Sequence, residues 1–296
     1  MYRKLSAMLV LAALGFSAVP ASAFFEDVAV SPRSRGMGET GVTVPDGPYA
    51  AFHNPGQLAE NPLGGVAASY VRPFGLSYTD YYFVGVGLRS AEKRGGFGLG
   101  FSQFKVQYDD VDLQDETRVG LSYGHRLYGD MHSTIDVGLT MNWYHVKQGE
   151  TVTGVDPGND SCLGFDLGFL FTLHKRTRLG FLVKNLNNPN IGVDEEELPQ
   201  QLAAGLSYEP YTGVITTFEV DNELGRNTQY KGGAEMVIFP GFALRAGVIT
   251  NPNKVTMGFG IDVERVVINY GFSTGGGVLD STHQFGINLT WGGEAQ

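Results

Sequence analysis

Hydrophobic and polar residues alternate with a period of two from Gly64 to the end of the chain. In residues 162–173, leucine and phenylalanine take every second position, and glycine, aspartate or threonine mostly fill the positions between. The same alternation runs through 135–143, 255–264 and 284–291. Successive side chains of a β-strand point to opposite faces. Repeated alternating segments of roughly ten residues are typical of a transmembrane β-barrel, with apolar side chains facing lipid and small or polar ones facing the lumen.

We predict an all-β fold, an antiparallel transmembrane barrel of about fourteen strands over residues 64–296. The predicted strands lie near residues 65–73, 80–90, 96–107, 116–126, 132–147, 161–174, 177–187, 200–209, 212–222, 228–238, 241–249, 253–263, 266–274 and 281–291. Connections after even-numbered strands are tight, whereas those at 108–115, 148–160 and 186–199, after odd-numbered strands, are long. Short periplasmic turns and longer outer loops are typical of bacterial outer-membrane barrels.

Hairpin geometry predicts which charged residues oppose each other on the lumen face, because the turn fixes the register of the two strands. The three predicted lumen ion pairs are Asp166 with Lys184, Glu219 with Lys231, and Glu235 with Arg245. Each such pair contributes a few tenths to about 1 kcal/mol, so we expect the pairs to fix register more than stability.

The first residues have the pattern of a secretory signal peptide. Arg3 and Lys4 precede an apolar run over 5–19, and Ala21-Ser22-Ala23 supplies a small-x-small cleavage pattern. We therefore expect export, cleavage before Phe24 and exclusion of residues 1–23 from the fold. No later stretch is long and apolar enough to predict a transmembrane helix.

Residues 24–63 show weak periodicity, with at most a short helical turn near 49–52. A disordered arm is one interpretation. The segment is rich in glycine and proline but also contains several large apolar side chains, so we favour a compact hatch in the barrel mouth.

Composition supports a membrane barrel over a soluble β-sandwich. The 296 residues include 42 glycines, and only 18% of them are charged, whereas a soluble domain usually has about 25%. The net charge of −10 argues against a nucleic-acid partner. Cys162 is the single cysteine, which excludes an internal disulfide and favours an inert thiol inside a strand.

Two motifs in the hatch could carry function. Residues 36–41 match G-x-G-x-x-G, but no strand precedes them and no helix former follows, so Gly36 and Gly38 indicate tight turns instead of a dinucleotide site. Asn54-Pro55 followed by Gly56 is typical of a turn that fixes the hatch.

Enzyme, metal and cofactor chemistry have weak support. Acidic residues cluster at 109–116 and 194–197. A calcium site there is one interpretation, but no EF-hand spacing is present and we favour a solvated acidic rim. His145 and His283 lie in or beside strands without a serine and an acidic residue in matching phase, and no G-x-S-x-G occurs. We expect no catalytic residues, no metal and no cofactor.

Residues 31–59, which include R-G-M-G and Asn54-Pro55, resemble the start of mature FadL-superfamily and PorV/PorQ-like proteins. Weaker similarity continues at 184–186, 198–208, 244–247 and 282–289. The chain has Gly56 where the family has alanine, and Trp291 with a short tail where the family has a terminal phenylalanine. The resemblance implies a fourteen-stranded outer-membrane barrel with a periplasmic-side hatch.

The resemblance leaves three functions open. FadL-type members pass hydrophobic compounds toward a lateral wall opening, which implies passive transport here, with Gly36, Gly38, Asn54 and Pro55 gating the lumen. PorV-type members are outer-membrane partners of a protein secretion system, which would bind protein through the acidic loops. A purely structural outer-membrane protein is the third alternative. The expected partners are outer-membrane lipid and either hydrophobic small molecules or a secretion-system protein.

Overall fold

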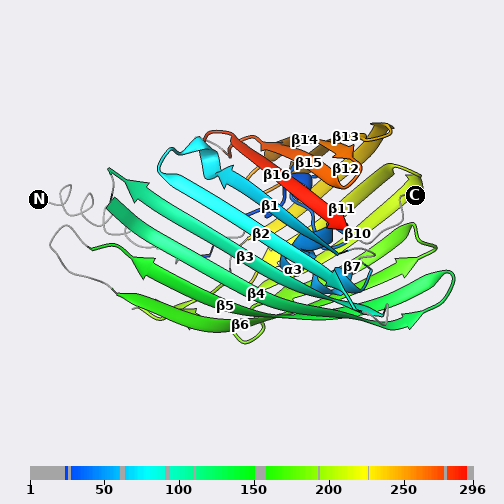
Figure 1. Ribbon diagram of the computed structural model, residues 1–296. Coiled ribbons are helices and arrows are strands. Elements are labelled where there is room, and N and C mark those ends of the chain that lie inside the picture. The colour runs from blue at the N-terminus through cyan, green and yellow to red at the C-terminus, as the bar shows by residue number, and fades with distance from the viewer. Residues whose placement is uncertain are drawn as a thin grey trace, which may run out of the picture.

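The computed structural model of the protein describes residues 24–25, 28–60, 64–90, 94–109, 111–150, 158–192, 194–225, 227–276 and 279–291. The expected signal peptide, residues 1–23, lies outside this range. Within it, fourteen antiparallel strands form one closed barrel, and two further strands form a small separate hairpin (Figure 1). The predicted fold class is therefore confirmed.

Each barrel strand pairs with its neighbours along the chain, and β1 closes the barrel by pairing with β16. The barrel strands are β1 (Gly64–Arg72), β2 (Thr79–Arg89), β3 (Gly95–Tyr108), β4 (Val111–Gly129), β5 (Ser133–Gln148), β6 (Asn159–Leu173), β7 (Thr177–Lys184), β10 (Gln201–Tyr211), β11 (Val214–Glu223), β12 (Thr228–Phe239), β13 (Phe242–Ile249), β14 (Lys254–Val263), β15 (Val266–Ser273) and β16 (Thr282–Trp291). The separate hairpin, β8 (Asn190–Ile191) with β9 (Glu196–Glu197), lies in the connection between β7 and β10.

The barrel has two different ends, which we call the turn end and the loop end. The turn end carries Gly64 and Trp291, together with short connections such as 174–176 and 264–265. The loop end carries the longer connections, 149–158 and 185–200 among them. This arrangement agrees with the predicted alternation of short and long connections.

The connection between β3 and β4 is shorter than predicted. Both strands continue beyond a register shift after Val106, and Gln107 pairs with Asp112 and Tyr108 with Val111. β3 therefore ends at Tyr108 and β4 already begins at Val111. The acidic residues between 111 and 116 lie on β4, because backbone pairing continues through a segment whose charge indicated a loop.

On the barrel strands apolar side chains point outward and polar side chains point inward, the opposite of a soluble protein. On the outer face of β3 and β4, Phe97, Leu99 and Leu121 are 49%, 46% and 55% exposed, while Ser102 and Ser122 face inward and are buried. An apolar outside and a polar inside are typical of a barrel surrounded by lipid. Among the described residues, no helix is long and apolar enough to cross a bilayer.

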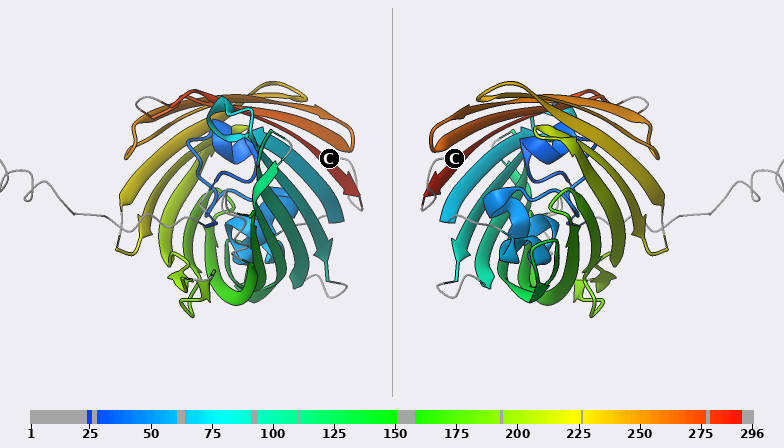
Figure 2. Two further views of the ribbon diagram at one scale, coloured as in Figure 1. Left: turned by 90° about the vertical axis from the view of Figure 1, so that its left-hand side faces the viewer. Right: turned by 90° about the vertical axis from the view of Figure 1, so that its right-hand side faces the viewer.

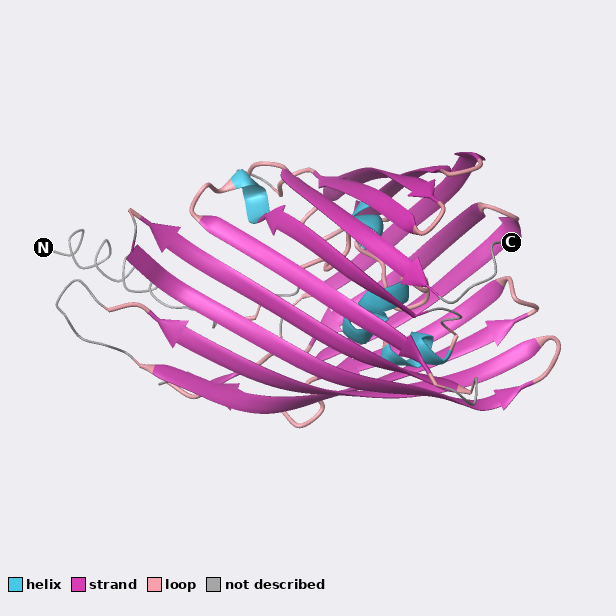
Figure 3. Ribbon diagram, viewed as in Figure 1, coloured by secondary structure: helices cyan, strands magenta, loops and turns pink. Residues whose placement is uncertain are grey.

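Residues 28–60 run through the inside of the barrel, where Figures 2 and 3 show their helices enclosed by strands. We call this segment the hatch. Its helices are short: α2 (Pro32–Gly36), η1 (Gly47–Tyr49), α3 (Ala50–His53) and η2 (Pro55–Ala59), while η3 (Pro73–Gly75) lies outside it, after β1. Just before the hatch, Phe24 packs on Ile191 at the loop end. At the other end of the hatch, Glu60 accepts hydrogen bonds from Thr172 and Arg178 near the turn end.

Glycines of the wall allow the hatch backbone to touch the strands. An ideal Cβ on Gly138 would lie 2.2 Å from the carbonyl carbon of Pro55, and one on Gly233 would lie 2.2 Å from Met37 O. Gly38 of the hatch has φ +71°, and a Cβ there would lie 2.4 Å from Gly232 O. The glycines of the lumen face thus leave the space that the hatch backbone occupies. Any larger side chain at these positions would displace the hatch.

Candidate functional site

The hatch leaves a series of cavities in the lumen. The first, at the loop end, has a volume of about 320 Å³ and is lined by residues that include Phe74, Phe104 and Lys254. Lys254 Nζ lies 5.7 Å from the centre of the Phe74 ring, a cation–π distance. This cavity therefore combines aromatic surface with a cation in its lining.

A central cavity of about 110 Å³ follows on the same path. It shares Val28, Glu39 and Tyr81 with the loop-end cavity, so the two adjoin. Its lining combines aromatic side chains such as Phe52 with buried polar groups such as Asp221.

The path narrows beyond the central cavity, inside the hatch. The next space is a crevice that is too narrow to hold a water molecule. Its lining includes Arg33, Met37, Val44, Asp46 and His53. On its far side a cavity of about 530 Å³ at the turn end again includes Arg33 and Asp46 in its lining. Among the cavities described here, this crevice is the narrowest space between the central cavity and the turn-end cavity.

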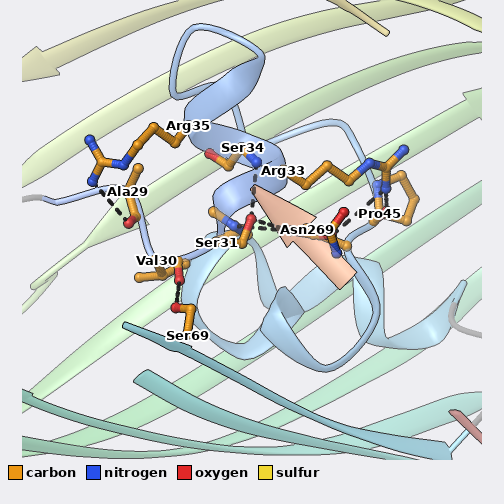
Figure 4. A network of polar contacts seen from close by, with 12 residues as sticks. Ala29, Val30, Ser31, Arg33, Ser34, Arg35, Pro45, Ser69 and Asn269 are labelled. Carbon is orange, nitrogen blue, oxygen red and sulfur yellow. Dashed lines mark hydrogen bonds and ion pairs between the residues drawn. The ribbon is translucent and has the colours of Figure 1, made fainter. Parts of the chain in front are cut away.

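An ionic contact joins the hatch to the wall at this constriction. Arg33 donates to both carboxylate oxygens of Glu235 on β12, at 2.9 and 2.6 Å. It also donates to Pro45 O at 2.7 Å (Figure 4). Burial alone would lower the pKa of Arg33, but Glu235 and Asp46 raise it above its ordinary value, so the guanidinium stays charged. Arg245 Nε also donates to Glu235, at 2.6 Å. We call Arg33, Glu235 and Arg245 the ionic latch.

Asn54 fixes the other half of the hatch. Its side-chain oxygen accepts from Gly56 N at 2.9 Å, and its Nδ2 donates to Val42 O at 2.9 Å and to Phe169 O at 3.0 Å. The residue is fully buried. One amide thus starts the η2 turn, joins two parts of the hatch and connects the hatch to β6.

Further polar contacts connect the hatch with strands around the barrel. Glu219 of β11 accepts from Gly41 N and Val42 N, both at 3.0 Å. Arg35 Nε donates to Gln284 of β16 at 2.7 Å. Gly38 N donates to Thr256 of β14 at 2.9 Å. Because charged and buried partners hold the segment on several sides, the hatch has one defined position in the lumen.

Comparison with known proteins identifies the fold. No family model and no curated protein matches the sequence. Among solved structures, the monoaromatic hydrocarbon channel CymD aligns with a TM-score of 0.62 and 16% identity, over 90% of this chain and 98% of that chain. The toluene transporter TodX of Pseudomonas putida has a TM-score of 0.61 and 13% identity over 90% and 98%. A Pseudomonas aeruginosa FadL homologue has a TM-score of 0.55 and 13% identity over 88% and 98%.

The chain has the fold of these channels. Identities this low establish architecture alone, and this architecture agrees with the barrel that the FadL resemblance implies. Membership of the FadL superfamily stays a prediction. The PorV/PorQ-like part stays a prediction.

The structure places the predicted gating residues at contacts between hatch and wall. Gly36 and Gly38 approach the wall strands β14 and β12, and Asn54 and Pro55 pack on Gly168 of β6. Their role in gating the lumen stays a prediction.

The residues of the three predicted ion pairs are arranged differently from one pair to the next. Glu235 and Arg245 are opposed and in contact at 2.6 Å. Glu219 and Lys231 are also opposed, and their charges attract each other. The Lys231 ammonium lies 2.7 Å from Asp221 as well, and the Glu219 carboxylate also accepts from the hatch.

The third predicted pair lies just beyond the end of a ladder. The ladder between β6 and β7 has the predicted register and ends at Leu167 and Val183, one residue before Asp166 and Lys184. The Asp166 carboxylate lies 3.3 Å from Arg118 of β4 and accepts from Asn142 of β5 at 2.7 Å. The pairing of Asp166 with Lys184 stays a prediction. Hairpin register predicts only which residues are neighbours on adjacent strands. It could not predict that the long Arg118 side chain of β4 reaches across β5 to Asp166 on β6.

Other candidate chemistry is sparse. His145 Nδ1 and Ser161 Oγ lie 2.8 Å apart on the outer face, a contact that the sequence did not indicate; among the described residues no carboxylate completes a triad there. No three His, Cys, Asp or Glu side chains within the described ranges are grouped to hold a metal ion. Burial of the lumen carboxylates is instead explained by Arg, Lys and backbone partners.

Sequence reasoning did not predict that Arg33 and Asp221 would line the lumen cavities. Arg33 lies in the S-P-R-S-R stretch, and its partner Glu235 is 202 residues away. The only signal available was a pair of arginines inside an otherwise apolar and glycine-rich segment, since a buried arginine requires an acidic partner.

Proposed function

We propose that the protein is a passive channel of the bacterial outer membrane that admits small hydrophobic molecules. The observation that supports this best is the series of three cavities, of about 320, 110 and 530 Å³, with a narrow crevice of the hatch between the second and the third. Diffusion down a gradient needs no energy source or catalytic group. The fold supports the proposal because CymD and TodX are described as a hydrocarbon channel and a toluene transporter.

The proposal includes export by removal of residues 1–23 and a barrel oriented with its turn end in the periplasm. It also assigns the hatch, with Gly36, Gly38, Asn54 and Pro55, the role of a gate. The alternative, an outer-membrane partner of a secretion system, gains no support from the channels that share the fold.

The test is uptake in Gram-negative cells that lack a hydrocarbon channel of their own. Intact outer membranes are preferable to phospholipid vesicles, because apolar solutes cross plain phospholipid quickly. Cells that produce the protein should take up radiolabelled toluene, supplied at low concentration, faster than cells that produce an unrelated barrel in equal amount. Equal uptake rates would exclude the proposed transport.

A further inference from the structure

Charged side chains gather on one part of the outer face, at the loop-end border of β1 to β5. Register places them in a single row. Asp80 of β2 pairs with Lys105 of β3, Lys105 with Asp115 of β4, and Asp115 with Lys147 of β5. Arg72 of β1 joins the row by donating to Asp80 at 3.0 Å. The row therefore alternates in sign across five adjacent strands.

The border of β11 to β13, on another side of the barrel, is uncharged. Within the described part of the chain, the outward positions nearest the loop end of these three strands are occupied by Asn222, Thr228 and Thr250. The charged row is thus a feature of one face of the barrel.

On β3 and β5 the two lysines lie just beyond the apolar outer band. Each is four residues, about 14 Å along the strand, from an outward aromatic residue, Phe101 on β3 and Trp143 on β5. The positions between hold Gln103 and His145, and the His145 ring stacks on Trp143 with centres 5.4 Å apart. Outward aromatic side chains near the end of an apolar band mark the membrane–water interface of a barrel. Since the strands are tilted, the lysines lie at the depth of the lipid head groups.

The charges leave the two lysines with a surplus of positive charge. Lys105 Nζ lies 3.6 Å from Asp115 Oδ2, and Lys147 opposes the same Asp115 from the other side. Asp80, the other carboxylate beside Lys105, accepts from Arg72. Lys105 is 44% exposed and Asp115 28%, so the cation is more accessible than the carboxylate that it faces. An exposed pair of this kind contributes about 0–1 kcal/mol, so stability alone does not account for the row.

Acidic residues at the tip of the same hairpin lie farther from the membrane. Asp109 lies in the turn between β3 and β4, and Asp112 is three residues beyond Asp115 toward that turn. The lysines are therefore the charges of this hairpin and its neighbour that lie closest to the apolar band. An anionic group that approaches from the lipid meets positive charge first.

The spacing and height of this face fit a large head group. Lys105 and Lys147 are two strands apart, a separation of about 10 Å. Cations at this separation can contact phosphates at opposite ends of one disaccharide. β3, β4 and β5 have 14, 19 and 16 residues, whereas β13 and β15 have 8 each, and Figure 1 shows the longer strands projecting farther at the loop end. This side of the barrel is therefore tall enough to contact a layer of sugars above the lipid chains.

We propose that the outer face of β3 to β5 binds a phosphorylated glycolipid of the outer leaflet, with Lys105 and Lys147 each contacting one of two phosphates on its disaccharide. Lysine ammonium groups bind phosphate through charge-assisted hydrogen bonds. The acyl chains would lie along the apolar band, past Phe101 and Trp143. The proposal rests on the outer-membrane location with the loop end outward, which is part of the proposed function, but it does not require transport.

The experiment measures lipid binding by native mass spectrometry of the full-length barrel released from detergent micelles, with a chelator present to remove bridging metal ions. The two main probes are lipid A with two phosphates and lipid A with one phosphate and the same acyl chains. The wild-type protein should bind the two-phosphate form at least fivefold more tightly, because the one-phosphate form leaves one lysine without its charge-assisted contact.

Lys105→Gln combined with Lys147→Gln should remove this preference. Both lysines are exposed on the outer face, so the barrel should fold without them. Lys175→Gln combined with Arg176→Gln is the matched control, because it removes the same charge from the exposed turn between β6 and β7 at the opposite end. This control should keep the fivefold preference.

Several outcomes would overturn the site. Equal binding of the two forms by the wild-type protein, or an unchanged preference in the lysine variant, would leave the row as an ion-pair ladder that only holds the strands in register. Loss of the preference in the control as well would reduce it to an effect of net charge. Phosphatidylglycerol bound as tightly as the two-phosphate form would overturn the assignment to a glycolipid. The channel function is tested separately by toluene uptake and does not depend on these results.

Discussion

Arg33 of the hatch and Glu235 of the wall share two hydrogen bonds, of 2.9 and 2.6 Å, although 202 residues separate them along the chain. Glu235 keeps a second partner in Arg245 at 2.6 Å. Loss of Arg33 would therefore remove the ionic contact between the hatch and β12 without leaving an unpaired carboxylate in the lumen.

Arg33→Met should open the constriction. The substitution removes the charge-assisted hydrogen bonds to Glu235 and keeps a side chain of similar length. We expect it to make docking of the hatch against the wall less favourable by about 2 kcal/mol. In planar bilayers the variant should show larger or more frequent conductance steps than the wild type. Arg72→Met is the control, because Arg72 is 50% exposed on the outer face. Indistinguishable traces from Arg33→Met and wild type would mean that the latch does not hold the path closed.

A disulfide between hatch and wall should block transport. An ideal Cβ on Gly205 lies 3.0 Å from Thr43 Cγ2, a separation compatible with disulfide geometry. Thr43→Cys with Gly205→Cys, in a Cys162→Ser background, should reduce toluene uptake to the level of cells without the channel, and a reductant should restore it. Each single-cysteine variant is the control. Full uptake with the cross-link verified by mass spectrometry would show that transport does not require the hatch to move away from β10.

Gly168→Ala should displace the hatch, whereas Gly232→Ala should not. A Cβ at Gly168 would lie 2.0 Å from Asn54 Oδ1, while the nearest atom to a Cβ at Gly232 is 3.8 Å away. Since the Asn54 bonds would be disturbed, trypsin should cleave at Arg33 and Arg35 at least tenfold faster in Gly168→Ala. Equal cleavage rates in the two variants would mean that Asn54 does not position the hatch.

Leu121→Arg should impair insertion into bilayers. Leu121 is 55% exposed in the apolar outer band, and a cation near mid-membrane costs about 2–4 kcal/mol. Tyr108→Arg is the matched control, because Tyr108 is 67% exposed at the loop-end tip of β3, where water is available. The fraction that folds into lipid vesicles, measured by the gel shift on heating, should fall for Leu121→Arg only. Equal folding of both variants would argue against lipid contact at Leu121.

The strands could be predicted because a barrel wall has the simplest possible environment, with lipid on one side and lumen on the other. Leu167 and Phe169 alternate with Gly168 and Leu170, and even this short run shows that an inward leucine can interrupt the pattern without destroying it. The β3–β4 connection was misjudged because acidic residues at the exposed tip of a strand resemble those of a loop.

The lumen contacts were harder to predict. Glu219 faces Lys231 as the register requires, yet its carboxylate binds two backbone N–H groups of the hatch. Nothing local in β11 indicates that a segment about 180 residues earlier supplies those donors. Sequence patterns thus predicted which residues point inward but not which of them would meet the hatch.

The separation between Arg35 and Gln284, 249 residues, has a consequence for assembly. Contacts between the two extremes of a chain form only after the entropy of closing a very long loop has been overcome. The hatch therefore reaches its resting position late, once the last strands of the barrel are present. A nascent or truncated chain that lacks β12 to β16 keeps the hatch contacts to β6 and β11 but loses the partners of Arg33, Arg35 and Gly38, so only the completed barrel fixes the first half of the hatch.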